Sequence, residues 1–258
     1  MGSIKLSNVS KNFRRPDGAT LEVLDRVSFE AGQGSFSSIL GPSGCGKSTI
    51  LSLIAGLEQQ SSGTIAVDGR EMGKGHAGGP RMGYVFQRPR LLEWRTVTEN
   101  VFLPLERTST DRSAMVASAE KYLNLVGLEG YEAYYPAQLS GGMQQRVAIA
   151  RALVIEPEIL LMDEPFSGLD EMTARSMREE LLLIWQETGK TILFVTHSIG
   201  EAVFLSQQIL MVGRKPASIQ NRATIDLPYP RKYGDLAMFE LETRLTQDFL
   251  AMHPHPQS

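Results

Sequence analysis

A glycine-rich run near residue 41 carries the clearest chemistry in the sequence. The segment 41–49 reads GPSGCGKST and fits the pattern G-x-x-x-x-G-K-[ST], placed between an expected strand and an expected helix. Its glycines allow positive φ angles, so that successive backbone N–H groups can converge on phosphate oxygens. Lys47 is expected to reach the β and γ oxygens of a bound nucleotide, and the Ser48 hydroxyl is a suitable ligand for Mg²⁺.

Two acidic residues close an apolar run farther along the chain. Asp163 and Glu164 directly follow Ile159-Leu160-Leu161-Met162, which has the length and composition of a buried strand. With a phosphate-binding loop upstream, Asp163 is expected to complete the Mg²⁺ shell, and Glu164 to orient or deprotonate an attacking water. The alternative is that both acids simply end the strand and cap the next turn of the chain.

A second segment also has the character of an anion site. Ser140, Gly141 and Gly142 precede a helical pattern that runs to about Val154, so Ser140 can cap that helix and the glycines expose backbone N–H groups. One nucleotide is already expected at the loop 41–49. A second phosphate-reading segment makes sense if two chains close face to face and each contacts the other's nucleotide; the alternative is a plain helix cap.

The elements that must position these residues alternate between strand and helix. Strand patterns are expected at 4–6, 23–29, 36–40, 64–67, 81–86, 159–162 and 191–196, and helical patterns at 47–57, 113–126 and 172–187, the last ended by Gly189. Strands separated by crossover helices predict an α/β fold with a parallel sheet. We expect an antiparallel portion from the N-terminal region, a helical insertion at about 96–154, one nucleotide-binding domain over 1–228, and a C-terminal appendage or tail over 229–258.

Composition narrows the protein classes. The chain has 258 residues, a formal net charge of −3 and one cysteine. These numbers are typical of a globular protein in a reducing compartment, and they disfavour a domain that binds the phosphate backbone of nucleic acids. The longest apolar runs are about four or five residues, against the ~20 needed to span a bilayer. We therefore expect a protein that serves a membrane, if at all, as a peripheral partner.

The order of these motifs resembles the ATP-binding cassette (ABC) ATPases, over about residues 4 to 228. The resemblance implies that Gln87 senses Mg²⁺ and the attacking water, that His197 contacts the γ-phosphate, and that Asp170, in Ser167-Gly168-Leu169-Asp170, couples two sites across a dimer. The implied catalytic residues are Glu164, His197 and Gln87, and the implied metal ligands are Ser48, Gln87 and Asp163. The implied ATP contacts are Phe13 (stacked on adenine), Gly41, Pro42, Ser43, Gly44, Cys45, Gly46, Lys47, Ser48, Thr49, Ser140, Gly141, Gly142, Gln144 and Asp170.

A finer resemblance points to the nitrate/sulfonate/taurine branch of bacterial importers. It rests on the segments 85–97 (VFQRPRLLEWRTV), 201–205 (EAVFL) and 226–231 (DLPYPR). It implies an ATP hydrolase with ATP and Mg²⁺ that powers a separate transmembrane permease at the cytoplasmic face of the cell membrane. The implied partners are that permease, a second ATPase subunit (a copy or a close relative) and a substrate-binding protein, with no direct contact to nucleic acid.

Other functions compete with this one. A lipid-exporting or lipid-extracting cassette and a non-transport cassette acting on nucleic acid or the ribosome share the same motifs, whereas a P-loop kinase would leave the 140–146 segment unexplained. Two further patterns are set aside. Gly73 to Gly78 fits G-x-G-x-x-G without the strand and helix that a dinucleotide site needs, and His253 and His255 stand in a proline-broken tail.

An apolar cluster follows Gln87. Leu91, Leu92 and Trp94 lie in a connection where polar residues are usual. They either pack under the helical insertion or dock a helix of the permease. In the second case Gln87, at the end of the segment near the nucleotide, would let this one short segment transmit the state of the nucleotide to the permease.

Overall fold

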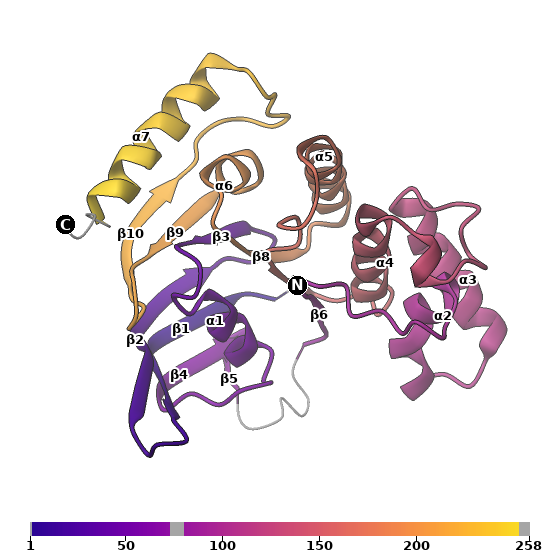
Figure 1. The fold of residues 1–258 in the computed structure, drawn as a ribbon, viewed down its shortest axis with the longest axis horizontal. Coiled ribbons are helices and arrows are strands. Elements are labelled where there is room, and N and C mark those ends of the chain that lie inside the picture. The colour runs from indigo at the N-terminus through magenta and orange to yellow at the C-terminus, as the bar shows by residue number, and fades with distance from the viewer. Residues whose placement is uncertain (1, 73–79, 253–258) are drawn as a thin grey trace. The chain divides into compact units, whose positions relative to one another are not determined.

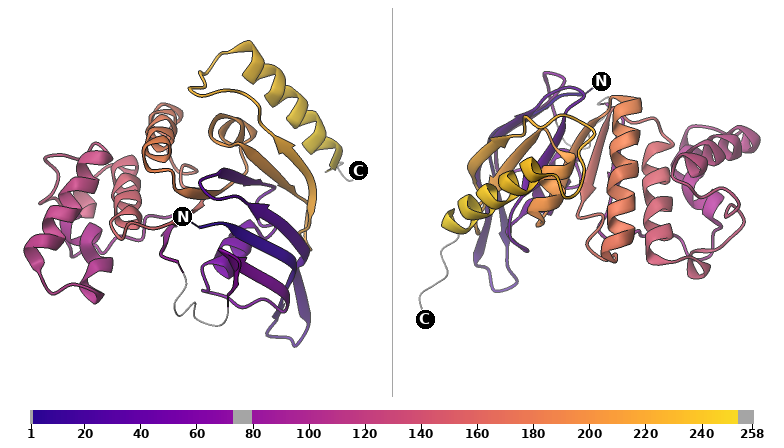
Figure 2. Two further views of the ribbon diagram at one scale, coloured as in Figure 1. Left: turned by 180° about the vertical axis from the view of Figure 1, so that it is seen from behind. Right: turned by 90° about the horizontal axis from the view of Figure 1, so that it is seen from above.

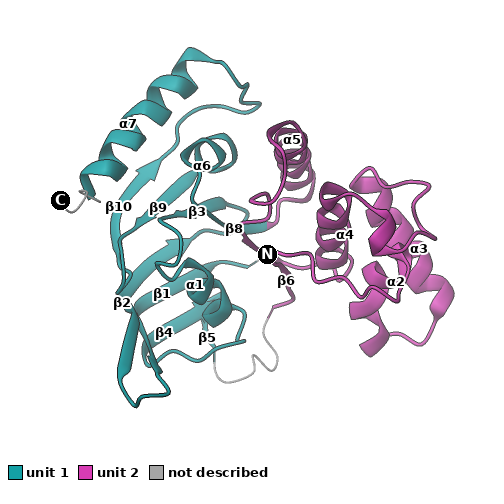
Figure 3. Cartoon of the chain, in the orientation of Figure 1, with its two compact units in different colours: residues 1–79, 191–258 teal, residues 80–190 magenta. Residues whose placement is uncertain are grey.

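The structure is a computed structural model that describes residues 2–72 and 80–252. The chain divides into two compact units: unit 1 comprises residues 1–79 and 191–258, and unit 2 comprises residues 80–190 (Figure 3). The glycine pattern at 73–78 and the two histidines at 253 and 255 lie outside the described residues.

Unit 1 begins with an antiparallel sheet (Figure 1). Its strands, in pairing order, are β2 (Thr20–Ala31), β1 (Ile4–Arg14), β4 (Ser62–Val67) and β5 (Arg70–Glu71). Buried Ile4 and Leu6 alternate with exposed Lys5 at the start of β1, as expected for a sheet with one apolar face. The β1–β2 ladder shifts register where Asn8 and Arg26 adopt left-handed φ angles of 50° and 45°.

Unit 1 also contains a set of parallel strands. These are β9 (Gln208–Val212), β3 (Phe36–Leu40) and β8 (Thr191–Thr196), in that pairing order, with β10 (Ile219–Thr224) antiparallel to β9. Every side chain of β3 and β8 is buried, which is typical of parallel strands covered on both faces. The helices of this unit are α1 (Lys47–Ile54), α6 (Ile199–Leu205) and α7 (Leu236–Met252).

Unit 2 combines a parallel strand pair with a helical cluster. The strands are β6 (Met82–Val85) and β7 (Ile159–Asp163). The helices are α2 (Val97–Phe102), α3 (Arg112–Leu125), α4 (Gly141–Leu153) and α5 (Glu171–Thr188), with 3₁₀ turns η2 (Leu103–Arg107) and η3 (Pro136–Gln138). Helices α2, α3 and α4 pack on one another, and α4 lies beside α5 in each view of Figure 2.

The predicted α/β class is confirmed, and most predicted elements lie where the sequence indicates. No helix or strand was predicted for the region after Arg214, where periodicity is weak and prolines are scattered. It instead contains β10, paired with β9, and the 17-residue helix α7, packed on α6. Burial of one face against α6 orders this segment, and short-range periodicity reports such packing poorly. Within the described residues no helix is long and apolar enough to cross a membrane.

Candidate functional site

The phosphate-binding loop leaves the carboxyl end of β3 and enters α1. Gly46 precedes the helix with a φ of 124°, and an added Cβ would lie 3.0 Å from Leu24 Cδ2 and 3.1 Å from Val23 Cγ1. Glycine is therefore required both by the backbone conformation and by the close approach of β2. The loop and helix arrangement predicted from the sequence is present.

Lys47 is almost fully buried at the first position of α1. Only 3 % of the residue is exposed, and its amino group donates to the carbonyl oxygens of Gly41 (2.9 Å) and Pro42 (3.0 Å). The ammonium is thus held across the loop, where backbone N–H groups and the start of a helix favour anions. Ser48, the next residue, is exposed and carries the hydroxyl expected at a metal.

His197 lies beside this loop in unit 1. In the β3–β8 ladder Leu40 pairs with Thr196, and the Gly41 N–H donates to the Thr196 carbonyl at 3.4 Å. The loop and His197 therefore leave neighbouring strand ends at one edge of the sheet. His197 is exposed between β8 and α6, so its ring is accessible at that edge.

Phe13 stands apart on the N-terminal sheet. It is half-buried on β1 opposite Leu21, and the Lys11 amino group lies 4.4 Å from the centre of its ring. This cation contact uses one face of the ring. Its predicted stacking on adenine stays a prediction.

In unit 2 the acidic pair follows β7 as predicted. Asp163 is the last residue of the strand, and Glu164 adopts a left-handed φ of 43°. A glutamate in that region is strained by about 1–2 kcal/mol, and strain of this kind concentrates at functional positions. Gln87 is brought to the same segment, because its amide donates to the Ser167 hydroxyl at 3.1 Å.

The N-terminal ends of α4 and α5 lie side by side in unit 2. Ser140 Oγ accepts the Met143 N–H at the start of α4, and Asp170 Oδ1 accepts the Thr173 N–H at the start of α5. A Cβ on Gly142 would lie 2.6 Å from Thr173 Cγ2, so glycine there permits the close approach. Ser140, Gly141 and Asp170 are exposed.

Electrostatics and amide geometry add detail at these helix starts. The pKa of Asp170 is lowered, chiefly because its carboxylate accepts the backbone N–H of Thr173. Gln144, expected to contact nucleotide, turns its amide back to the Pro136 carbonyl at 3.0 Å. In the structure this amide therefore holds the chain that enters α4.

The segment between Gln87 and Thr96 is pinned by two residues that the sequence did not single out. Asn100, fully buried, donates to the carbonyls of Leu92, Arg95 and Thr96 and accepts the Leu92 N–H at 2.7 Å. Arg151 donates to the carbonyls of Pro89 and Arg90, and burial lowers the pKa of its guanidinium. The partners of Asn100 lie four to eight positions before it, whereas those of Arg151 lie about sixty positions away, so the contacts of Arg151 have no local sequence signal.

This pinned segment holds Trp94 in the open. Its side chain is 74 % exposed, while Leu91 and Leu92 are half-buried. Packing of Trp94 under the helical insertion, one of the two alternatives raised by the sequence, is therefore wrong. The neighbouring Arg95 pairs with Glu106 at 2.6 Å.

Glu106 belongs to a groove in unit 2 with a volume of about 720 Å³. The groove is lined by Met82, Gly83, Tyr84, Phe86, Arg90, Leu103, Pro104, Glu106, Arg107, Arg151, Ala152 and Ile155. Its floor is apolar and aromatic, with Tyr84 and Phe86 stacked at 4.3 Å and Arg90 over the Phe86 ring at 4.0 Å. Three arginines against one glutamate give its rim a positive balance.

The sequence and structure match known proteins over nearly all their length. Residues 24–167 match the family model described as ABC transporter. The chain is 40 % identical to the aliphatic sulfonates import ATP-binding protein SsuB of Bacillus cereus, covering 96 % of each chain. It is 44 % identical to the taurine import ATP-binding protein TauB of Rhizobium johnstonii, covering 90 % of this chain and 87 % of the relative. The chain belongs to the ABC transporter family.

A solved structure supports the same conclusion for the fold of this ABC protein. A dimeric ATP-binding cassette in a post-hydrolysis state, bound to ADP and phosphate, superposes with a TM-score of 0.76 at 32 % identity, covering 87 % of this chain and all of the other. The protein is therefore an ABC-type ATPase that binds and hydrolyses ATP. The family, fold and enzyme predictions made from the motifs are confirmed.

The candidate metal ligands of this ATPase have suitable chemistry for Mg²⁺. Ser48, Asp163 and Gln87 offer a hydroxyl, a carboxylate and an amide oxygen. Mg²⁺ prefers such oxygen ligands and binds through one or two carboxylates together with substrate phosphates. The residues present thus fit the ion.

Proposed function

We propose that this ABC ATPase powers a separate membrane permease that imports a small anionic solute of the nitrate, sulfonate or taurine type. The similarity to the sulfonate and taurine import proteins supports the solute class. The observation that carries the permease is the exposed Trp94, held on a pinned segment that begins at Gln87. Exposed aromatic anchors are characteristic of interfaces.

The proposed catalytic roles follow from the chemistry of the residues. Residues 41–49 bind the triphosphate, with the Lys47 ammonium neutralising charge on its outer oxygens. Ser48, Asp163 and Gln87 would hold Mg²⁺, which would neutralise the negative charge of the bound phosphates. Glu164 orients and deprotonates the attacking water, and His197 contacts the γ-phosphate.

We further propose that two cassettes close on two nucleotides. Ser140 and Gly141 begin α4 beside the start of α5, and both are exposed, so their N–H groups are available to an anion from a second chain. Asp170 at the neighbouring helix start would couple the two sites. Phe13 would stack on the adenine, and the residues from 229 onward would form a C-terminal appendage to the nucleotide-binding domain.

The docking place for the permease is the groove beside η2. Its apolar floor fits the apolar face of a short helix, and its arginine-rich rim favours acidic side chains or a helix C-terminus on the partner. This arrangement would hold the ATPase as a peripheral subunit at the cytoplasmic face of the membrane. A substrate-binding protein would deliver the solute on the opposite side.

Co-purification tests this function. The ATPase is expressed with a candidate multi-span permease, sought among the neighbouring genes, and ATP hydrolysis by the reconstituted complex is measured with nitrate, alkanesulfonates and taurine. We expect a stable complex whose turnover rises with one of these solutes in the presence of its binding protein. A complex stimulated by lipid alone, or an ATPase that associates with nucleic acid or ribosomes instead, would replace this proposal with one of its competitors.

A further inference from the structure

The C-terminal end of α6 has backbone carbonyls that need hydrogen-bond donors from outside the helix. This helix has seven residues, and its last carbonyls have no donors within it. The Gln207 N–H, which would continue the helix, donates instead to Phe36 of β3 at 2.8 Å. The carbonyls at the end of α6 belong to buried residues, where an unpaired polar group is costly.

Arg231 satisfies most of these groups. It is 5 % exposed, and one terminal nitrogen of its guanidinium donates to the carbonyls of Val203, Phe204 and Ser206. The other two nitrogens donate to the Leu227 carbonyl, at 3.2 and 3.0 Å. A buried guanidinium at a helix C-terminus also complements the helix dipole.

Tyr229 completes the same arrangement. Its hydroxyl donates to the Leu205 carbonyl at 2.8 Å, and the Arg231 guanidinium lies 4.2 Å from the centre of its ring. Carbonyls 203 to 206 are therefore all paired by two side chains from the segment 229–231. Nearby, the ring of Tyr233 stacks on Phe204 of α6, with centroids 4.3 Å apart.

The opposite end of α6 is joined to β8 by hydrogen bonds of the residues on either side of His197. The Ser198 N–H donates to Thr196 Oγ1, and Ser198 Oγ accepts the Glu201 N–H. The Thr196 hydroxyl in turn donates to the Glu201 carboxylate. Thr196 and Ser198, the neighbours of the exposed His197, are thus both hydrogen-bonded at the junction of β8 and α6, and the seven residues of α6 span only about 10 Å.

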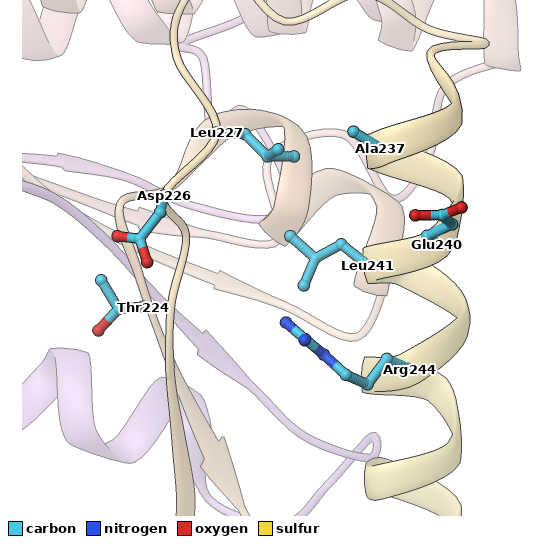
Figure 4. A pocket seen from close by; sticks show the side chains of 7 residues that line it. All are labelled: Thr224, Asp226, Leu227, Ala237, Glu240, Leu241 and Arg244. Atoms are coloured by element: carbon cyan, nitrogen blue, oxygen red, sulfur yellow. The ribbon is translucent and has the colours of Figure 1, made fainter.

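Helix α7 packs on α6. Figure 4 shows Leu227 and Leu241 facing one another across a hollow of about 400 Å³, with Arg244 reaching in from α7. A Cβ added at Gly200, three residues after His197, would lie 3.7 Å from Glu242 of α7. The segment 229–231 therefore contacts the C-terminal end of α6, and α7 contacts α6 near its N-terminal end.

We propose that Arg231 is a positioning residue for ATP hydrolysis: by holding the C-terminal end of α6 it sets the place of His197. This inference rests on the proposed role of His197. It assigns to the segment 227–231 and to α7 a part in setting the rate of the ATPase, beyond that of an appendage.

The test is a set of double-mutant cycles in the full-length chain. Arg231→Met removes the donors, Arg231→Lys keeps the charge without the planar fork, and Tyr229→Phe removes a single hydroxyl. Each is made alone and with His197→Ala. The matched control is Arg222→Met, which removes an exposed arginine of β10 whose guanidinium donates to the Ser28 carbonyl of β2. Measurements are kcat, KM for ATP, the ratio of ATP to ADP affinity, and Tm.

We expect Arg231→Met to lower kcat by about 10- to 100-fold with little change in KM, since small misplacements of a reacting group have effects of that size. ATP should lose affinity relative to ADP, and Arg231→Lys should recover part of the rate. In the His197→Ala background these effects should disappear.

Other outcomes overturn the proposal. If the Arg231 substitutions lower kcat equally with and without His197, or lower only Tm, Arg231 is merely structural. If Arg231→Met fails to fold, Arg231→Lys and Tyr229→Phe decide by the same criteria. Normal hydrolysis in His197→Ala alone would also refute the proposed catalytic role of His197. If His197→Ala lowers kcat strongly and the double variant loses the product of the two single losses, only the positioning role of Arg231 is refuted.

Discussion

Trp94→Ala separates folding from docking in this ATPase. Since 74 % of Trp94 is exposed, only about a quarter of it contributes to packing within the chain. A surface substitution of this kind changes the free energy of unfolding by about 0.5 kcal/mol or less, equivalent to a Tm shift of roughly 2 °C or less. An aromatic anchor at an interface is worth about 2 kcal/mol or more, which corresponds to about a 30-fold rise in the Kd for the permease.

The assay compares three quantities in the same preparations: Tm, basal ATP hydrolysis and permease binding. We expect the first two to stay near the wild-type values and the third to weaken. Leu183→Ala on α5 is the matched control, because Leu183 is a large apolar residue of comparable exposure (59 %) outside the segment that follows Gln87. A Trp94→Ala protein that melts many degrees lower while still binding the permease would refute the docking assignment.

Further substitutions test the remaining assignments. Glu164→Gln should retain ATP and slow hydrolysis by roughly 10²–10⁴, with an ATP-dependent dimer visible by light scattering; near-normal turnover would exclude Glu164 as the base. Lys47→Ala should instead weaken ATP binding, measured by calorimetry, so the two variants should fail at different steps. The lowered pKa of Asp170 means that its charge stabilises the fold fully above the ordinary aspartate value of about 3.9 and loses that effect as pH falls through the lowered value. Asp170→Asn keeps the helix cap, so acid unfolding curves should become flatter; an unchanged curve would contradict this assignment. Burial raises the pKa of Tyr229 to about 12. The neutral hydroxyl therefore stabilises the fold fully below the ordinary tyrosine pKa of about 10, and this stabilisation is lost as pH rises through the raised pKa. Tyr229→Phe should remove this alkaline loss, followed by unfolding and tyrosinate absorbance against pH, and an alkaline limb identical to that of the wild type would refute it.

Elements defined by near neighbours were predictable from the sequence. Ser140 caps α4 and Gly189, with a φ of 60°, ends α5, because capping depends on residues within about one turn. The phosphate loop is of the same kind: its conformation follows from glycines placed between a strand and a helix. Its expected helix did end earlier than predicted, at Ile54.

Tertiary structure alone decided the long-range contacts. Nothing near Arg231 in the sequence indicates that it pairs carbonyls of α6, because those partners lie 25 to 28 positions earlier. The same holds for Arg151, which pins the segment after Gln87 from 61 and 62 positions away.

The contrast between these two groups has one physical cause. The residue types that bind phosphate and polarise water act through their own chemistry, so the sequence by itself determined the family and predicted the roles proposed for Lys47 and Glu164. The exposure of Trp94 and the pairing of the α6 carbonyls depend instead on which distant backbone groups need a partner once helices and strands have packed. A buried carbonyl must accept a hydrogen bond from whatever donor the fold brings to it. That requirement exists only in the folded chain.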